Sequence, residues 1–550
     1  MHVTVADFVS RFDSGEIRLP IMQRDYIWPT GKVLKLLDSL YKRWPIGSFY
    51  VWQTSEDYPS KDKFGGYTKK LDGIYGFLLD GQQRLTSLAL AVRGVADGDL
   101  EYRAFFDLEN ERFYRGKSTK TITKRVENGD AALVPLSDIV IIEESGAKAK
   151  TKNIQNIIDG LKEQKKLGIN SKNETIYRER LDRLADLYKP DALCEVFSDK
   201  TEEDAFELFY RLNKGGTSLK AGDVEGARLA SASTKKIVGP MRGVAAEKEM
   251  KTLGLNFIFL LRCLVTVHRG NCKFSDLPKS WAEDAKQVEA SWRSTEKAVR
   301  STVKLVSSEF GWATRRWLPS TMALIPVVYL LAKHPGHSLS AADRKHVRQY
   351  LLLTGLRSIF RGAPETGVNS YVNALRKSVG GFSEECRALG AKVPKNQRYP
   401  IQKFEVRNCS GMYAPLMQIY LAMLCSANAK SWPSGRSLAD VVAEALPTDP
   451  LAVHHIFPKK FMLSLDFAVG QLNTMANYAI ISQADNAELA DRDPFEVWRS
   501  LKSNQREWAS QQLCFSVAKE DLLKHGEYEG FLDFRSEQIA KKLNAFLGIA

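Results

Sequence analysis

Residues 451–458 read LAVHHIFP, residues 476–482 read ANYAIIS, and Asn486 follows shortly after the second run. Each run is short and apolar, with the branched and aromatic residues typical of a strand. Asn486 begins a segment with a helical pattern, and Pro494 lies eight residues beyond it. The order predicts a hairpin of two strands followed by a helix, which is a ββα unit.

Two adjacent histidines, His454 and His455, end the first of these strands. Hydrolysis of a phosphodiester requires a base that activates water and a cation that stabilises charge on the leaving oxygen. We expect His455 to be the base, with the side-chain carbonyl of Asn477 fixing its tautomer and orientation. His454 and Asn486 are expected to bind one divalent ion, Mg²⁺ or Mn²⁺. The alternative is a histidine pair packed at a strand end beside ordinary turn asparagines.

A second polar turn, DGQQR at residues 80–84, lies between a predicted strand and a helical pattern. The free N–H groups and the positive dipole end of the following helix face whatever occupies such a turn. Gly81 allows a close approach to the backbone, Arg84 can donate to a phosphate through two nitrogens, and Asp80 can hold Mg²⁺ or orient a water. The turn therefore predicts an anion or phosphate site, with a capped surface turn as the alternative.

Two further runs combine polar and aromatic residues. Residues 20–28, PIMQRDYIW, precede a helix whose expected N-cap is Thr30. This composition suits stacking and hydrogen bonding to a base or nucleotide, although a packed aromatic corner has it too. Residues 206–217, FELFYRLNKGGT, end a predicted helix in a polar turn, for which a glycine C-cap is the alternative. The side chains of interest are Gln23, Arg24, Tyr26, Trp28 and Asn213.

The chain has 550 residues, too many for one hydrophobic core, so two or three domains are expected. Residues 1–230 mix strand and helix patterns, with a charged, helical stretch at residues 140–200. Residues 231–430 hold mainly long helices and are predicted to form a helical connector. A Ser, Pro and Gly stretch at residues 431–435 is the expected linker to a compact domain at residues 431–550. The fold class predicted is α+β, mainly helical.

The charge balance favours a polyanionic partner. The chain has 79 Lys and Arg residues against 65 Asp and Glu, a formal net charge of +14. Phosphates neutralised by Lys or Arg release condensed counterions, which favours nucleic-acid binding. A basic surface without such a partner is the alternative.

The cysteines and apolar stretches indicate the compartment. The seven cysteines are scattered and contain no CxxC pair, which argues against a disulfide framework or a zinc ribbon and fits a reducing cytoplasm. The longest apolar stretches, residues 256–267 and 321–332, are too short to span a bilayer. We expect a soluble, cytoplasmic bacterial protein without a membrane partner.

The C-terminal motifs resemble the HNH domain of GmrSD-type restriction endonucleases. The resemblance rests on the His-Ile-Phe-Pro run from His455, the Asn-Tyr-Ala-Ile run from Asn477, and the later Asn486 and Pro494. It implies a ββα-metal nuclease fold. Many HNH enzymes have Asp or Glu at the position of His454.

The N-terminal runs look like the ParB/sulfiredoxin-like domain of the same family, whose relatives include SspE and BrxU. The runs that carry the resemblance are QRDYIW, DGQQRLT and FYRLNKGGTSL. The resemblance implies binding of a nucleoside triphosphate (GTP, UTP or ATP) and its hydrolysis with the help of Asp80. The implied nucleotide-binding residues are Gly81, Gln82, Gln83, Arg84, Gln23, Arg24 and Asn213.

Together the motifs and the resemblance predict a metal-dependent DNA endonuclease or nickase; regulation by an NTP and a role in anti-phage defence are what the resemblance implies. Its expected partner is double-stranded phage DNA, with modified DNA sensed through Tyr26 and Trp28, and a homodimer is an open expectation. One alternative is a nucleotide-switched DNA-binding protein whose HNH-like domain is inactive. Another is an NTPase coupled to an RNase.

Overall fold

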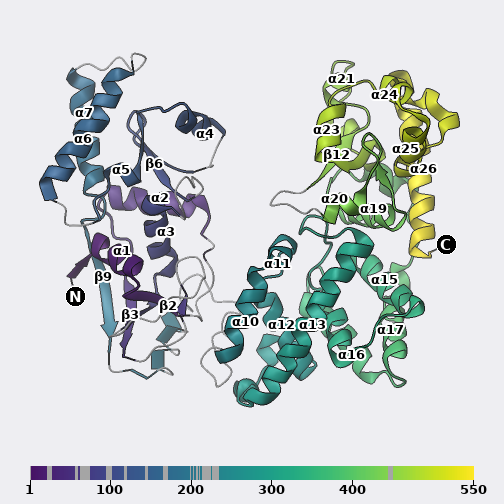
Figure 1. Ribbon diagram of the computed structural model, residues 1–550, viewed down its shortest axis with the longest axis horizontal. Helices are drawn as coiled ribbons and strands as arrows, with labels where there is room; N and C mark the ends of the chain where they lie inside the picture. The colour runs from purple at the N-terminus through teal and green to yellow at the C-terminus, as the bar shows by residue number, and fades with distance from the viewer. Residues whose placement is uncertain are drawn as a thin grey trace. The chain divides into compact units, whose positions relative to one another are not determined.

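The computed structural model forms two compact units, Met1–Ser231 and Ala232–Ala550 (Figure 1). The second unit contains both the predicted helical connector and the predicted ββα unit. The residues described are 2–20, 26, 28–55, 60–61, 75–94, 102–116, 120–142, 146–164, 171–198, 200–201, 204–205, 208–209, 211–212, 225, 229, 235–443 and 450–549.

A mixed six-stranded sheet forms the centre of the first unit, in the order β1-β9-β3-β5-β2-β4. Its strands are β1 (His2–Thr4), β2 (Ile17–Pro20), β3 (Phe49–Thr54), β4 (Ser60–Lys61), β5 (Tyr75–Asp80) and β9 (Asp191–Phe197). Strand β3 is parallel to β9 and β2 is parallel to β5, whereas the other neighbours are antiparallel. The end of β5 carries Asp80, so the sheet positions the DGQQR turn.

Three helices pack with this sheet around one hydrophobic core: α1 (Val5–Ser14), α2 (Thr30–Tyr41) and α3 (Gln82–Arg93). A capping box starts α1, because Thr4 accepts from the backbone N–H of Asp7 and the Asp7 carboxylate accepts from that of Thr4. Helix α3 is buried along nearly its whole length, as expected of a helix enclosed by its neighbours. Helix α2 begins with Thr30 as its first residue and Pro29 as its N-cap, so the expectation of an N-cap at Thr30 is wrong.

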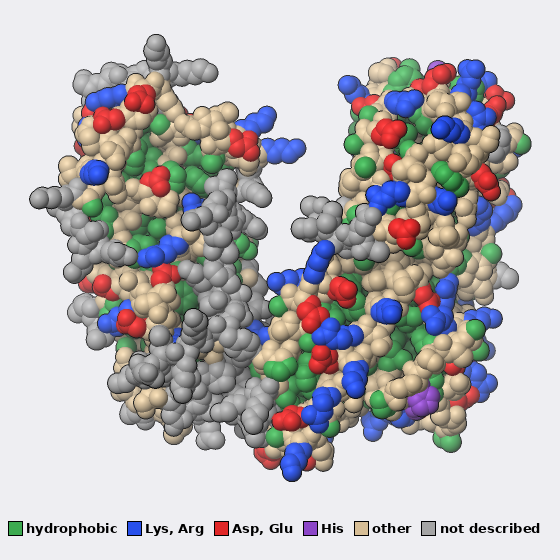
Figure 2. All heavy atoms as spheres, viewed as in Figure 1, with side chains coloured by type: hydrophobic (Ala, Val, Ile, Leu, Met, Phe, Trp, Pro, Cys, Tyr) green, Lys and Arg blue, Asp and Glu red, His purple; other side chains and the backbone are tan. Residues whose placement is uncertain are grey.

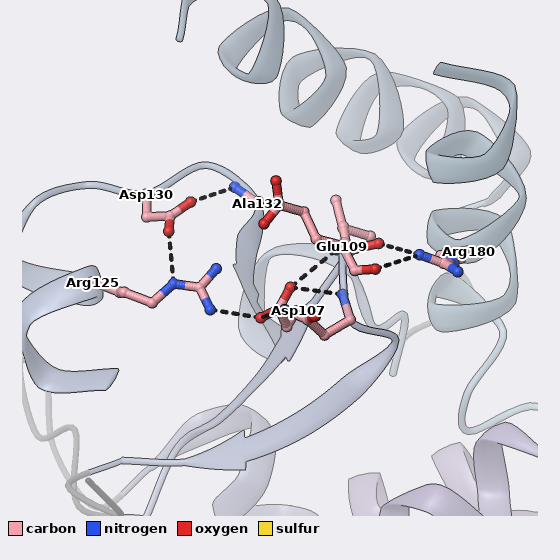
Figure 3. Close-up of polar contacts among 8 residues, drawn as sticks. Asp107, Glu109, Arg125, Asp130, Ala132 and Arg180 are labelled. Atoms are coloured by element: carbon pink, nitrogen blue, oxygen red, sulfur yellow. Dashed lines mark hydrogen bonds and ion pairs between the residues drawn. The ribbon is translucent and has the colours of Figure 1, made fainter. Parts of the chain in front are cut away.

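A smaller antiparallel sheet, β7-β6-β8, completes the strands described in this unit. Further elements are β6 (Ala104–Asp107), β7 (Arg112–Arg115), α4 (Lys120–Glu127), β8 (Leu133–Pro135), α5 (Leu136–Ile139), α6 (Gly146–Glu163) and α7 (Ser171–Ala185). Asp107 is the last residue of β6, and its buried carboxylate accepts a hydrogen bond from Arg125 at 2.6 Å (Figure 3). It also accepts one from the Asn110 side chain at 2.9 Å. Arg125 also donates to Asp130 at 2.7 Å. This network joins α4 to the turn after β6.

The second unit begins with a stack of helices. They are α10 (Lys235–Ala246), α11 (Lys248–Leu253), α12 (Phe257–Arg269), α13 (Ala285–Phe310), α14 (Leu324–Lys333), α15 (Ala341–Leu356), α16 (Pro364–Lys377), α17 (Phe382–Ala391), α18 (Lys403–Asn408) and α19 (Pro415–Ser426). The long helix α13 contacts α12, α14 and α19. No helix within the described residues is long and apolar enough to span a bilayer.

The C-terminal part of this unit contains the predicted ββα unit. Its hairpin is β12 (Leu451–His455) paired antiparallel with β13 (Tyr478–Ser482), with His455 opposite Tyr478. Helix α23 (Gln483–Leu489) follows directly. A core of aromatic and aliphatic residues joins the hairpin to α24 (Pro494–Ser500), α25 (Ser503–Leu513) and α26 (Tyr528–Leu547). The short helices α21 (Lys459–Leu463) and α22 (Val469–Leu472) lie between the two strands in sequence.

The fold is α+β and mainly helical, as predicted, but two segments differ from the sequence expectations. Strand β9 lies inside the six-stranded sheet, within the stretch at residues 140–200 that was expected to be helical. The expected linker is part of a small hairpin, β10 (Lys430–Ser431) and β11 (Arg436–Ser437). Ser431 and Trp432 are buried, because Trp432 packs into the C-terminal core and Ser431 donates to the buried carboxylate of Asp485. This segment is therefore anchored by packing.

Candidate functional site

The hairpin places the two histidines in different surroundings, because successive residues of a strand face opposite sides. His454 is 8% exposed and lies near the ring of Trp432, with the ring centroids 6.4 Å apart. Its Nδ1 lies 3.1 Å from Oδ1 of Asn486 on α23. The hairpin and the following helix thus bring together the two residues that were predicted to bind a metal ion.

The His454 and Asn486 pair fits one divalent cation. Mg²⁺ prefers octahedral coordination at about 2.1 Å, for which neighbouring ligand atoms lie about 3.0 Å apart. The 3.1 Å between Nδ1 and Oδ1 is close to this spacing. In the structure this contact is a hydrogen bond that Nδ1–H donates to the amide oxygen, so a metal held by the pair would require the other tautomer of His454, with its proton on Nε2. Among the described residues there is no group of three or more His, Cys, Asp or Glu side chains arranged to hold a metal ion. A metal bound by this pair would therefore take its remaining ligands from water and substrate oxygens.

His455 is only partly buried, and two residues fix its ring. Its Nε2 lies 3.2 Å from Oδ1 of Asn473, and the ring of Tyr478 meets it edge to face at 5.0 Å between centroids. Since an amide oxygen accepts only, Nε2 carries the proton in this hydrogen bond. The lone pair of the neutral ring is then on Nδ1, which is the state that a general base requires.

Both imidazoles are neutral near pH 7. Burial lowers the pKa of His454 to about 4, although the hydrogen bond with Asn486 and the nearby charge of Asp491 oppose this shift. Burial also lowers the pKa of His455, against the hydrogen bond with Asn473 and with the help of Lys459. A neutral histidine is the form that binds a metal or accepts a proton from water.

Asn477 has a different role from the one expected. Its Oδ1 accepts from the backbone N–H of Phe457 at 2.8 Å, and its Nδ2 donates to the carbonyls of Phe457 and Leu472. The side chain is fully buried. Asn477 therefore connects the backbone on both sides of the insertion between the strands. The residue that hydrogen-bonds His455 is Asn473.

Two other residues of the site were missed from the sequence. Arg535 on α26 is fully buried and donates to the carbonyls of Met475, Ala476 and Tyr478 at 2.6 to 3.0 Å. It holds the backbone segment that carries Asn477. Asp491 lies close enough to His454 to affect its pKa. No local pattern marks either residue, since Arg535 is one of several charged residues in a long helix and Asp491 is one of several acidic residues after α23.

In the first unit, the guanidinium of Arg84 bonds within the fold. Nη1 donates to the carbonyl of Ile46 at 2.7 Å, and Nη2 donates to the carbonyl of Ser48 at 2.7 Å and to Asp80 at 3.1 Å. The side chain is 16% exposed. Arg84 was expected to donate to a phosphate through two nitrogens. In the structure these nitrogens instead hold the loop between α2 and β3.

Glycine is required on both sides of this guanidinium. Gly81 has a φ of +96°, and a Cβ there would lie 2.4 Å from the ring of Phe49. Gly47 has a φ of +85°, and a Cβ there would lie 2.3 Å from Nη1 of Arg84. Side chains other than glycine are strained at such angles. The group that lies closest to the backbone at Gly81 in this structure is therefore the Phe49 side chain of the same chain.

Other predicted nucleotide and DNA residues lie near this turn or outside the described residues. Gln82 and Gln83 are buried in the first turn of α3. The Tyr26 hydroxyl is 2.9 Å from that of Ser87 on the same helix, and Trp28 packs partly against the core. Gln23, Arg24 and Asn213 lie outside the described residues.

Arg115 and Tyr102 adjoin Tyr26 and were not predicted. The buried Arg115 guanidinium lies 5.5 Å from the ring of Tyr26 and 5.0 Å from that of Tyr102. An arginine among aromatic rings is a group that stacks on bases. Neither residue stands in a polar motif, which is why the sequence did not mark them.

Comparison with known proteins supports one family for the first unit. No curated protein matches the chain significantly. Residues 5–229 match the family model described as the N-terminal domain of GmrSD restriction endonuclease. The N-terminal part of the chain is thus similar to a restriction endonuclease domain, which supports a nuclease that acts on DNA in phage defence.

Proposed function

We propose that this protein is an HNH endonuclease or nickase that requires a divalent metal and is regulated by a nucleoside triphosphate. The observation that carries the proposal is the ββα unit with His454, His455 and Asn486 at its hairpin end. His455, whose tautomer is fixed by Asn473, is adjacent in sequence to His454, whose Nδ1 lies 3.1 Å from Oδ1 of Asn486. A general base and a divalent cation are the two groups that phosphodiester hydrolysis requires.

The residues divide the reaction between them. His455 accepts a proton from the attacking water at Nδ1, while Asn473 holds Nε2–H and Tyr478 fixes the plane of the ring. His454 and Asn486 would hold Mg²⁺ or Mn²⁺, which supplies positive charge to the scissile phosphate and its leaving oxygen. Asn477 and Arg535 keep the backbone around the site in place. One such site cuts one strand, so a double-strand break requires two sites or two encounters.

Regulation by GTP, UTP or ATP is proposed for the first unit. Support comes from Asp80 and Gly81 at the start of the long helix α3 and from the cluster of Tyr26, Tyr102 and Arg115. The helix start offers N–H donors to phosphates, and the cluster suits a base. Because Arg84 is engaged in the fold, it supports the site indirectly in this proposal. Recognition of modified phage DNA rests on the sequence resemblance.

The experiment compares the wild-type chain with His455→Ala on modified and unmodified phage DNA, with Mg²⁺ or Mn²⁺ and with or without each NTP. Loss of the base should reduce cleavage by ~10²–10⁴-fold. The melting temperature and DNA affinity should not change, because His455 is partly exposed. His525→Ala, an exposed histidine of the same unit, is the matched control.

The outcomes separate the alternatives. Cleavage at the wild-type rate by His455→Ala would remove this residue from the mechanism. Tight DNA binding without cleavage under any condition would select the DNA-binding alternative, and faster cleavage of matched RNA would select the RNase. A cleavage rate that is independent of all three nucleotides would remove NTP regulation from the proposal.

A further inference from the structure

Helices α13, α14 and α15 enclose an open groove of about 890 Å³ in the second unit. One face of α13 forms its floor, and the loop between α14 and α15 forms a wall. The basic residues that line it are Arg293, Lys297, Lys304, His334, His337 and Arg344. Among the described lining residues, none is Asp or Glu and none is Phe, Tyr or Trp.

The cations and hydroxyls follow one face of the helix. Arg293, Lys297 and Lys304 are four and seven residues apart, and Ser294, Ser301 and Ser308 follow at intervals of seven. At 1.5 Å per residue, the three cations span about 16 Å along the axis. This corresponds to about five base steps of duplex DNA at 3.4 Å each. Hydroxyls interspersed with cations are groups that commonly contact phosphates.

The two lysines are available for a ligand. Arg344 pairs with Glu309, and Arg293 lies 3.9 Å from Glu289, but neither acidic residue lines the groove. Lys297 and Lys304 are exposed and have no acidic partner within the described residues. Figure 2 shows Lys and Arg side chains of this unit interspersed with Asp and Glu on the face drawn. His334 likewise lies beside Glu385, so the unpaired positive charge of the described groove lining is that of Lys297 and Lys304.

We propose that this groove binds the phosphate backbone of double-stranded DNA. The inference rests on the proposed nuclease function and adds the surface that holds the substrate. A duplex fits better than a single strand, because single-strand sites use aromatic rings to stack bases and the described lining has no Phe, Tyr or Trp. Helix α13 contacts α20 (Leu438–Ala443), which contacts β13 of the nuclease hairpin, so the groove belongs to the same unit as the site.

The test measures binding of a fluorescent DNA duplex as a function of salt concentration. The variant is Lys297→Gln with Lys304→Gln in the full chain. The matched control is Lys286→Gln with Lys345→Gln, which removes the same charge from exposed lysines of α13 and α15 that do not line the groove. All four side chains are exposed, so the melting temperature should stay at the wild-type value.

Loss of two phosphate contacts should make the log–log salt slope less negative by about 1.8 and weaken binding at low salt by about ten-fold. The control should keep the wild-type slope. An unchanged slope in the groove variant, or an equal change in the control, would overturn the inference. A larger effect on a single strand of the same length would overturn the assignment to a duplex.

Cleavage by the wild-type chain is measured on the same DNA. If DNA binding depends on the groove lysines but no cleavage occurs, the proposed nuclease function is wrong and the proposed DNA-binding groove is supported. If the wild type cleaves DNA and the groove variant binds and cuts it equally well, the nuclease function is supported and the proposed DNA-binding groove is wrong.

Discussion

The hairpin at His454 and the turn at Asp80 both place charged or polar side chains at the junction of a strand and a helix, but they use them differently. At the hairpin, the nitrogen of His454 and the amide oxygen of Asn486 face each other. At the turn, the Arg84 guanidinium donates to two backbone carbonyls and to Asp80. The first arrangement is a hydrogen bond between the two proposed metal ligands, whereas the second stabilises a loop. Substitutions should therefore affect activity at the hairpin and stability at the turn.

The largest loss of stability is expected at the turn. Arg84→Ala should lower the free energy of unfolding by about 3 kcal/mol, because it leaves the carbonyls of Ile46 and Ser48 without their charged donor. Asp80→Ala should cost about 1 kcal/mol or less, because that ion pair is more exposed. Chemical denaturation without nucleotide measures both. Wild-type stability in Arg84→Ala would mean that the guanidinium is free to bind a phosphate.

Substitutions of Asn477 and Asn473 should have different effects, the first on stability and the second on cleavage. Asn477→Ala should lower the free energy of unfolding by about 2–3 kcal/mol, because three buried backbone groups lose their partner. Asn473→Ala should leave stability nearly unchanged and reduce cleavage by about ten-fold, because it releases the ring of His455. Denaturation and cleavage assays are run on both variants. The opposite pattern would restore the role first expected for Asn477.

The metal pair is tested by titration. His454→Ala and Asn486→Ala should each raise the concentration of Mg²⁺ or Mn²⁺ needed for half-maximal cleavage by about 10–100-fold. High metal should restore part of the activity, because the base His455 is still present. Titration curves that coincide with the wild type would show that other residues bind the ion.

A smaller loss of stability than that of Arg84→Ala is expected at Asp107, which is remote in sequence from both motifs. Burial disfavours its charge, but hydrogen bonds from Arg125 and Asn110 outweigh burial and lower its pKa. A lowered pKa in the folded state contributes stability above the ordinary carboxyl pKa of about 4, which is lost as the pH falls through the folded value. Asp107→Asn should cost about 1–2 kcal/mol at pH 7. Unfolding measured at several pH values should show this difference shrinking below about pH 4; a constant difference would contradict the linkage.

Local patterns predicted the elements that depend on neighbours in sequence. The apolar runs and the interval to Asn486 predicted a hairpin and a helix, and both are present. Gly81 was expected to let a phosphate approach the backbone, and this stays a prediction; the structure shows a φ of +96° and no room for a Cβ beside Phe49. Strand β9 was missed because its exposed and charged positions mask the alternation that marks a strand. Its place in the sheet comes from pairing with β1 and β3, which are far away in sequence.

The sequence by itself determined the mainly helical α+β character, the ββα order and the two histidines at a strand end. These features follow from short-range periodicity and turn chemistry. The tertiary structure alone decided that Asn473 contacts His455, that Arg84 bonds to a loop, and that Arg535 holds the backbone at Asn477. It also formed the basic groove from three helices. The reason is that a hydrogen bond needs its partner within about 3 Å, and for residues that are distant in sequence only packing sets this distance.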